Sequence, residues 1–334
     1  MRRPILVLVL CVLPLSSQTK KVLVEGNPAL AAELQSATPN AKVIAVNAQT
    51  VMGEIADADA FIGSIRPEQV RAGKKLKWVQ IMSAGVENVL MKSGTNDLRD
   101  SNIVLTNNKI VQGPEIADHA LAMLLTLTRG LNVAARNQKE QRWQARPYNG
   151  IELRGKTAVV LGMGGIGNQI ATRAWAFGMT VIGVDPEDKP LSPFLNKVVK
   201  PDQIDEVIPQ ADVVFISAPD TPMSHKMMGA SQFELMKPHS YFIAVSRGGL
   251  YAMDGLVKAL DSKRLDGAGV DVTDPEPLPK EHPLWKFDNA IITPHVAGRS
   301  DHDQERMIGT IKENLRRFVD GKPLLNVVDK QKGY

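Results

Sequence analysis

One stretch constrains the fold of this chain of 334 residues more than any other: Gly155–Pro186, which reads GKTAVVLGMGGIGNQIATRAWAFGMTVIGVDP. A short apolar run of strand type stops at Gly162, Gly164 and Gly167, where the chain must turn tightly and its backbone can approach a ligand. An amphipathic helix follows, and a second β-branched strand then ends in Asp185, 18 residues after Gly167. The pattern predicts a strand, a glycine turn, a helix, a strand and an acid.

Such a unit can hold a dinucleotide, because the N–H groups and dipole of the helix N-terminus face the pyrophosphate and the acid accepts hydrogen bonds from the adenosine ribose. All these parts fall where the mechanism needs them, so we favour a dinucleotide site over a purely structural glycine turn. Asp185 precedes Glu187 and Asp188, whose charges would repel a ribose 2′-phosphate, and no arginine or lysine stands beside it. We therefore expect NAD as the cofactor rather than NADP.

The composition excludes several classes of protein. A hydrophobic content of 43% over 334 residues is enough for the cores of two α/β domains. The formal net charge is only +4, and no basic stripe interleaved with aromatic residues is present, which argues against nucleic-acid binding. Cys11 is the only cysteine and the six histidines are scattered, so we expect no disulfide within the chain and no metal site.

The first residues follow the pattern of a secretory signal peptide. Arg2 and Arg3 precede the apolar run 5–15, and the small or polar residues 16–18 follow it. The run is too short to span a bilayer comfortably, so no stable membrane anchor is expected. We interpret residues 1–19 as a signal peptide and expect export to the periplasm or the exterior. The alternatives are a mis-assigned start codon or a hydrophobic N-terminal strand in a cytoplasmic protein, since NAD is normally a cytosolic cofactor.

An α/β section follows, in which short strand-type runs alternate with helical or turn stretches and so predict a parallel sheet. The runs cover residues 22–24, 43–46, 60–62, 78–82 and 103–106, and a helix is expected over 28–37. After Met82 the chain turns through Ser83, Ala84 and Gly85. Small residues there would leave backbone N–H groups open as a cradle for a substrate carboxylate, although an ordinary strand-to-helix turn fits them as well.

A helix is predicted to begin at Gly113, because proline suits the next position and an acid suits the first turn. It is apolar nearly all round, so it should be buried, plausibly between two domains. His119 lies on it, and we expect a satisfied core histidine rather than a ligand. Strand-type runs then recur at 213–217, 241–245, 268–270 and 290–292, and a last helix is expected over 301–318. With the two strands around the glycine turn they make six, the strand count of a doubly wound nucleotide domain.

Three side chains follow the last strands: Arg247, Glu276 and His295. The carboxyl ends of parallel strands share one edge, where ligands of open α/β sheets bind. Arg247 can hold a carboxylate and its neighbouring oxygen in a fork, and His295 can exchange a proton with a C2 hydroxyl as general acid/base. Glu276 can orient the imidazole and stabilise its charged form.

Each of the three has a plain alternative, as a solvated turn residue, an ordinary loop residue or the cap of a bend. Their arrival at successive strand ends favours hydride transfer to a 2-keto acid. Other ligand-binding residues are expected at the same turns and strand ends. The expected cofactor contacts are Gly162, Gly164, Gly165, Ile166, Gly167, Asp185, Ala218, Pro219, Thr221, Val245, Ser246, Arg247, Asp271, His295 and Gly298, and the expected substrate contacts are Ala84, Gly85, Arg247 and His295.

Six stretches resemble the D-isomer-specific 2-hydroxyacid dehydrogenase family, and the resemblance covers about residues 21–328. They are SAGVENV from Ser83, GPEIADHALAMLLTLTR from Gly113, ELRGKTAVVLGMGGIGNQIA from Glu152, SRGGLYAMDGLVKAL from Ser246, GAGVDVTDPEPLP from Gly267 and HPLWKFDNAIITPHVAG from His282. The resemblance implies an NAD-dependent enzyme that acts reversibly on the CH–OH group of D-2-hydroxy acids. It implies Arg247, Glu276 and His295 as the catalytic residues, the backbone at Ala84 and Gly85 on the substrate carboxylate, and Asp271 near the nicotinamide amide.

The resemblance also implies the architecture: a doubly wound parallel-sheet (Rossmann) NAD domain, residues 128–296, inserted in a flavodoxin-like α/β substrate domain, residues 20–127 plus 297–334. A homodimer is usual in the family. Ala84 and Val86 stand where members vary, so the substrate side chain stays open among acids such as glyoxylate, hydroxypyruvate and pyruvate.

Two branches of the family are disfavoured. Formate dehydrogenases carry an amide where Glu276 stands, and the extra C-terminal domain of long phosphoglycerate dehydrogenases is not expected. An NAD-sensing, corepressor-like binding protein on the same fold is the alternative function, and both the leader and the complete catalytic set argue against it.

Overall fold

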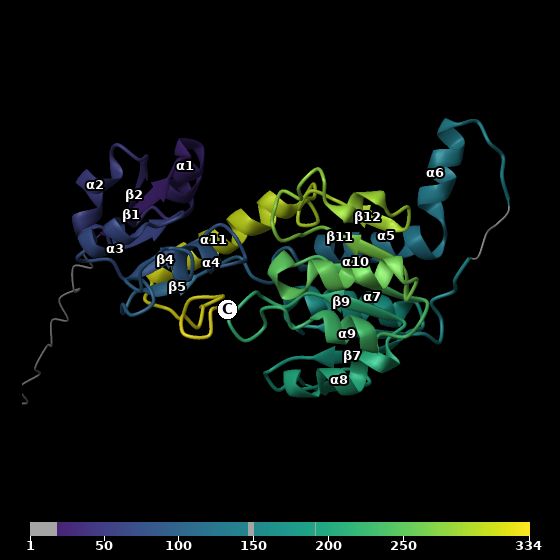
Figure 1. The fold of residues 1–334 in the computed structure, drawn as a ribbon. Helices are drawn as coiled ribbons and strands as arrows, with labels where there is room; N and C mark the ends of the chain where they lie inside the picture. The colour runs from purple at the N-terminus through teal and green to yellow at the C-terminus, as the bar shows by residue number, and fades with distance from the viewer. Residues whose placement is uncertain (1–18, 146–149, 191) are drawn as a thin grey trace, which may run out of the picture.

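The computed structural model describes residues 19–145, 150–190 and 192–334, which form two α/β parts, each built on its own parallel sheet (Figure 1). Residues 1–18, which make up all but the last residue of the predicted signal peptide 1–19 and include Cys11, lie outside the described residues. Within the described ranges, no helix is both long enough and apolar enough to cross a bilayer.

The first part has five strands in the order β2-β1-β3-β4-β5, and every neighbouring pair is parallel. This is the flavodoxin-like order, as the sequence predicts. All five predicted strands are present. The strand predicted over 78–82 ends two residues earlier, and the strand predicted over 103–106 begins one residue later. The strands are β1 (Lys20–Glu25), β2 (Ala41–Val46), β3 (Ala60–Ile62), β4 (Trp78–Gln80) and β5 (Val104–Thr106).

Helices from both ends of the chain complete this part. Leu34 of α1 and Leu315 of α11 share a buried core with Trp78, whose ring centroid lies 5.1 Å from that of Phe318. The N-terminal section and the last long helix therefore bury each other's apolar side chains. Short helices pack on the opposite face of the sheet. The helices are α1 (Pro28–Ala37), α2 (Val51–Glu54), α3 (Pro67–Ala72), α4 (Glu87–Leu90) and α11 (Asp303–Val319).

The second part is a parallel sheet of seven strands in the order β12-β11-β10-β9-β6-β7-β8. The prediction of six strands was wrong by one, because Lys197–Val199 forms β8 against β7, and this edge strand has only two apolar residues, between two lysines. From β6 the sheet is built outward to β7 and β8 on one side, and the chain then returns to add β9 on the other side of β6. The boundary between β6 and β9 is therefore the switch point of a doubly wound fold. The other strands are β6 (Thr157–Leu161), β7 (Thr180–Val184), β9 (Val213–Ile216), β10 (Ser240–Ala244), β11 (Leu265–Val270) and β12 (Ala290–Ile292).

Two helical layers cover this sheet, one on each face. Along β6, Ala158 and Val160 belong to the core under α5 and α7, whereas Val159 and Leu161 belong to the core under α8, α9 and α10. This alternation follows from the two-residue period of a strand and explains why β6 is apolar from Ala158 to Leu161. The helices are α5 (Gly113–Thr128), α7 (Gly165–Ala176), α8 (Ile204–Val207), α9 (Ala230–Leu235) and α10 (Met253–Asp261).

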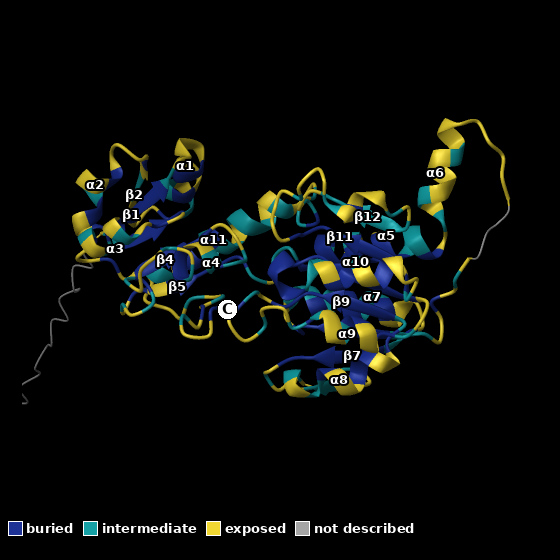
Figure 2. Cartoon of the chain, viewed as in Figure 1, coloured by how far each residue is buried: buried dark blue, intermediate teal, exposed yellow. Residues whose placement is uncertain are grey.

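Helix α5 is largely buried, as predicted, and its core lies with the seven-stranded sheet. Ala120 and Leu124 pack in one cluster with Ile170 of α7. At its start the contact is very close, since a Cβ on Gly113 would lie 2.8 Å from the carbonyl oxygen of Gly165. The domain boundary after residue 127, at the end of this helix, stays a prediction. By contrast, α6 (Leu131–Lys139) projects from the body of the second part and has no buried residue (Figures 1 and 2).

Candidate active site

The three glycines of the turn after β6 have different physical reasons to be glycine. Gly162 has φ +95°, and a Cβ there would lie 2.6 Å from the backbone nitrogen of Ala218. A Cβ on Gly167 would lie 1.9 Å from the carbonyl oxygen of Gly162, so this glycine lets α7 pack on its strand. Gly164 has nothing within 4 Å of its Cβ position, which leaves space above the turn for a ligand. These are the three roles that a dinucleotide turn requires.

The N-terminus of α7 offers unused donors. The N–H groups of Gly165, Ile166 and Gly167 donate no hydrogen bond within the described part of the chain. The hydroxyl of Ser246, at the end of β10, is buried and also has no partner there. Free helix N–H groups and the helix dipole favour an anion, so the residues present fit the pyrophosphate of a bound dinucleotide.

Asp185 ends β7 and is buried, with 6% of its surface exposed. One carboxylate oxygen accepts a hydrogen bond of 2.7 Å from the N–H of Met163, within the glycine turn. The other accepts one of 2.9 Å from the N–H of Glu187. The acid thus lies beside the turn, where an adenosine ribose would come.

The expectation that no cation stands beside Asp185 was wrong. The chain folds back after β7, and Nζ of Lys189 lies 3.0 Å from Oδ1 of Asp185. Glu187 and Asp188 also have lysine partners, Lys332 at 2.6 Å and Lys200 at 2.7 Å. Hydrogen bonds from Lys332 and then Tyr334 lower the pKa of Glu187, and the bond from Lys200 lowers that of Asp188. This end of the site carries paired charges, around a cavity of about 340 Å³.

The other predicted cofactor contacts lie around the same edge. Ala218 packs on Gly162, and the loop after it is held by Ser224, whose Oγ donates to the carbonyl of Pro219 at 2.6 Å and accepts from the N–H of Thr221 at 2.9 Å. Val245 is buried at the end of β10. The carbonyl of Gly298 accepts a hydrogen bond of 2.9 Å from the side chain of Gln112.

His295 and Glu276 form a pair. The imidazole Nδ1 lies 3.0 Å from Oε1 and 3.1 Å from Oε2 of Glu276, and both side chains are partly exposed. They follow β12 and β11, which are neighbours in the sheet, so residues 19 apart in the sequence meet at one edge. A carboxylate on Nδ1 leaves Nε2 as the ring nitrogen that faces away, available for proton exchange.

Asp271 holds the turn that carries His295. Its carboxylate accepts hydrogen bonds from the Thr293 hydroxyl at 2.5 Å and from the N–H groups of Val296 and Ala297, each at 2.9 Å. The side chain is 1% exposed, so both oxygens are engaged inside the protein. This contact fixes the backbone around His295, and the predicted contact of Asp271 with the nicotinamide amide stays a prediction.

His119 is not an isolated core residue. Its Nε2 lies 3.0 Å from the hydroxyl of Thr293 and 3.8 Å from Oδ1 of Asp271, and the side chain keeps 26% exposure. It is satisfied by a hydrogen bond, as expected, but that bond belongs to the Asp271 network. In the described ranges, no group of three or more histidine, cysteine or acidic side chains could hold a metal ion.

Arg247 follows β10 and reaches across to the first part of the molecule. Its Nε donates to Oε1 of Glu87 at 2.7 Å, its Nη2 lies 3.4 Å from Oε2, and its Nη1 donates to the carbonyl of Ser246 at 2.7 Å. Sequence reasoning missed Glu87, although SAGVENV was one of the matched stretches. Only the fold brings together two residues that are 160 positions apart.

The Ser83-Ala84-Gly85 turn lies next to this arginine. Its carbonyl groups are satisfied, because the Met82 carbonyl accepts from Asn108 at 2.7 Å and the Ala84 carbonyl accepts from Asn107 at 2.5 Å. The N–H groups of Ala84 and Gly85 donate no hydrogen bond among the residues described. A turn with held carbonyls and open N–H groups suits a carboxylate.

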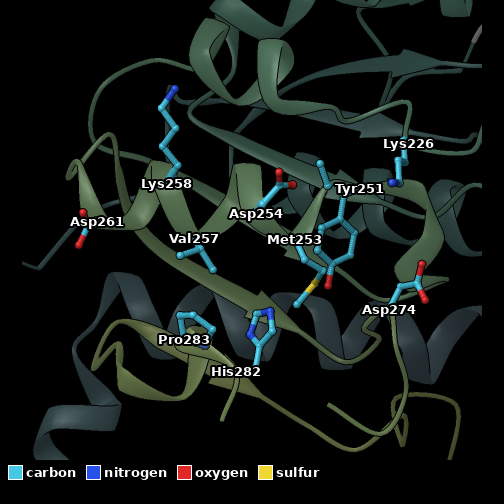
Figure 3. A pocket seen from close by; sticks show the side chains of 11 residues that line it. Lys226, Tyr251, Met253, Asp254, Val257, Lys258, Asp261, Asp274, His282 and Pro283 are labelled. Carbon is cyan, nitrogen blue, oxygen red and sulfur yellow. The ribbon is translucent and has the colours of Figure 1, made fainter. Parts of the chain in front are cut away.

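A larger cavity, of about 660 Å³, lies elsewhere, between the start of α10 and the loop before β12 (Figure 3). Lys226, Tyr251, Asp274 and His282 are among the residues that line it, and none of Arg247, Glu276 and His295 is. The Tyr251 hydroxyl donates to the carbonyl of Val272 at 2.6 Å, and burial raises the pKa of its phenol. The three predicted catalytic residues therefore lie at the carboxyl edge of the seven-stranded sheet and not around this cavity.

Comparisons with known proteins agree with this geometry. A family model described as "D-isomer specific 2-hydroxyacid dehydrogenase, NAD binding domain" matches residues 121–297. The chain is 31% identical over 287 residues to a D-3-phosphoglycerate dehydrogenase of Methanocaldococcus jannaschii. The matched stretch covers 84% of this chain and 53% of that protein. It is 30% identical over 292 residues to a glyoxylate reductase of Korarchaeum cryptofilum, which covers 85% and 86%.

A solved structure extends the likeness to the whole fold. The D-isomer specific 2-hydroxyacid dehydrogenase of Xanthobacter autotrophicus Py2, in complex with NADPH and MES, superposes with a TM-score of 0.81 at 25% identity and covers 95% of this chain and 100% of that one. The chain spans about half the length of the phosphoglycerate dehydrogenases that it matches, 53% of the Methanocaldococcus protein.

Proposed function

The chain belongs to the D-isomer-specific 2-hydroxyacid dehydrogenase family, and from that premise we propose that it is a dehydrogenase that transfers a hydride reversibly between a nicotinamide cofactor and C2 of a small D-2-hydroxy or 2-keto acid. The His295–Glu276 pair carries this proposal, since a histidine with an orienting carboxylate at the strand edge of a dinucleotide domain is a ready proton donor and acceptor.

Each side chain has one task. Arg247 and the open N–H groups of Ala84 and Gly85 bind the substrate carboxylate and so fix C2. Glu276 holds the imidazole through Nδ1, and Nε2 of His295 exchanges the proton of the C2 oxygen. The bound nicotinamide supplies or accepts the hydride.

We propose NAD as the preferred cofactor. Asp185 is buried beside the glycine turn, and its carboxylate suits ribose hydroxyls better than a 2′-phosphate. Lys189 and Lys332 weaken this preference, because each partly neutralises an acid at that end of the site. We therefore expect NADPH to bind, but more weakly than NADH.

We propose a homodimer with α6 in the interface. The helix projects from the body (Figure 2). Exposed apolar side chains lie on it and after it: Leu131 at 53%, Val133 at 43% and Trp143 at 102% exposure. Exposed apolar surface of this kind marks interaction sites.

Export through a cleaved leader is a separate proposal. A mature N-terminus near Gln18 in the native protein supports it, and an intact Met1 in a cytosolic fraction contradicts it.

The activity is tested by following NADH and NADPH oxidation by the purified chain with glyoxylate, hydroxypyruvate and pyruvate. We expect reduction of at least one of these acids to the D-hydroxy acid, faster with NADH than with NADPH at limiting cofactor. Tight NADH binding without reduction of any 2-keto acid would instead support the corepressor-like alternative.

A further inference from the structure

We propose that Glu87 is a positioning residue for substrate binding: its carboxylate holds the Nε–Nη2 edge of the Arg247 guanidinium so that the end-on Nη1–Nη2 edge receives the carboxylate of the substrate. This proposal rests on the proposed function, because it assigns a partner to the side chain that binds the 2-keto acid.

The hydrogen bonds of Arg247 define which donors remain. Nε and Nη2 face the two oxygens of Glu87, at 2.7 and 3.4 Å, and Nη1 donates to the Ser246 carbonyl at 2.7 Å. A guanidinium has one N–H on Nε and two on each terminal nitrogen. One N–H on Nη1 and one on Nη2 are therefore left, and these two form the end-on edge of the group. The fork predicted from the sequence is thus available only at that edge.

The turn that carries open N–H groups lies next to the guanidinium. A Cβ built on Gly85 would lie 1.9 Å from Nη2 of Arg247, so the guanidinium lies directly against the backbone of this glycine. The N–H groups of Ala84 and Gly85 are open among the residues described. The open turn and the arginine are therefore neighbours, and a side chain at position 85 would collide with the Arg247–Glu87 pair, since its Cβ would also lie 2.4 Å from Oε2 of Glu87.

The pair also joins the two parts of the molecule. Glu87 is the first residue of α4 in the five-stranded part, and Arg247 follows β10 of the seven-stranded part. The Glu87 side chain is 14% exposed and that of Arg247 is 33% exposed, so the pair is sheltered from solvent more than a surface ion pair. Holding Arg247 in one rotamer before the substrate arrives lowers the entropy lost on binding.

A different role for Glu87 predicts an effect of opposite sign. If its carboxylate occupied the place of the substrate carboxylate, the substrate would have to displace it, and removing the charge would tighten binding. If Glu87 positions Arg247, removing the charge frees the arginine and weakens binding. The direction of the change in KM therefore separates the two.

The test compares wild type, Glu87→Gln and Glu87→Asp in steady-state reduction of the best 2-keto acid at saturating NADH. We expect the KM of Glu87→Gln to rise about 10- to 100-fold, the range for a lost hydrogen bond to a charged group. We expect kcat to change far less, the Kd of NADH to stay within about 2-fold, and the carboxylate of Glu87→Asp to recover part of the loss.

Glu54→Gln is the matched control, because Glu54 pairs with Lys21 at 2.7 Å in the same part of the molecule and away from the site. It should leave KM unchanged. An unchanged or lower KM in Glu87→Gln overturns the proposal, and so does an equal loss of kcat and NADH binding, which a general structural defect would cause. If Glu87→Gln does not fold, a KM for Glu87→Asp equal to that of wild type overturns it. A wild-type chain that reduces no 2-keto acid overturns the proposed function and this proposal with it.

Discussion

The imidazole of His295 owes its place to two carboxylates with separate tasks. Glu276 contacts the ring at 3.0 Å, whereas Asp271 binds the N–H groups of the turn beneath it. One acid therefore orients the side chain and the other its backbone. A ring held in this way is prepared for proton transfer without rearrangement.

Glu276→Gln tests the orienting role. The amide keeps the size of the side chain but cannot stabilise an imidazolium, so we expect kcat for keto-acid reduction to fall about 10- to 1,000-fold, with little change in the Kd of NADH. Glu281→Gln, an exposed glutamate in the same loop, is the control and should behave as wild type. A kcat for Glu276→Gln within about 2-fold of wild type would remove Glu276 from the mechanism.

Single residues also show what the sequence can and cannot predict. Glu276 and His295 could be found because they lie in the loops after two strands, and parallel strands end at one edge. The Glu87–Arg247 pair could not, since it depends on how two sheets face each other. Lys189 lies four positions after Asp185, and only the course of the chain after β7 brings the two together.

In the β6–turn–α7 element, one glycine is required for packing and another leaves room for a ligand. Gly167 is confined by the carbonyl of Gly162 at 1.9 Å from its Cβ position, whereas Gly164 has an open Cβ position and a φ of −80°, which alanine adopts readily. The same amino acid therefore serves packing at one position and ligand approach at the other.

These two glycines give a paired prediction. Gly167→Ala should lower the free energy of unfolding by about 1–3 kcal/mol, because the helix must move away from the strand. Gly164→Ala should leave it unchanged and raise the Kd of NADH at least about 10-fold, because the methyl group fills the space of the pyrophosphate. Denaturant unfolding and a fluorescence titration measure the two quantities. Equal loss of stability in both variants would contradict the assignment.

Whole elements were predicted with uneven success, for physical reasons. The helix over 28–37 is found at its predicted bounds, with Asn27 as its N-cap, and the last helix within two residues of them. Strand β8 was missed because it lies at the edge of the sheet, where one face is only partly covered and an apolar run is not required.

At the scale of the molecule, the described chain passes between its two parts twice, before α5 and before α11. Helix α11 returns to the five-stranded part (Figure 1). Beyond it, Lys332 and Tyr334 reach Glu187 on the seven-stranded part. Arg247 and Glu87 make a second bridge. The spacing of strand-type runs predicted two parallel sheets, and the family resemblance implied their architecture. The placement of one sheet against the other had no signal in the sequence.

The projecting α6 gives a prediction about assembly. Replacing both Leu131 and Val133 by glutamate should convert a dimer into a monomer, because charges would have to be buried in an apolar interface. Light scattering coupled to size-exclusion chromatography measures the mass. As a control, glutamate at Val104, an exposed apolar residue of the other part, should leave the dimer intact. A wild-type chain that is monomeric at micromolar concentration would contradict the proposed homodimer.

The central claim is that this strand edge performs hydride transfer with His295 as its proton donor and acceptor. The most direct measurement is NADH oxidation on the preferred 2-keto acid by wild type and His295→Gln, with NADH binding titrated in both. We predict a loss of about 10²- to 10⁴-fold in kcat for the variant, with the Kd of NADH within about 2-fold of wild type. A variant that still reduces the keto acid at the wild-type rate would contradict the claim.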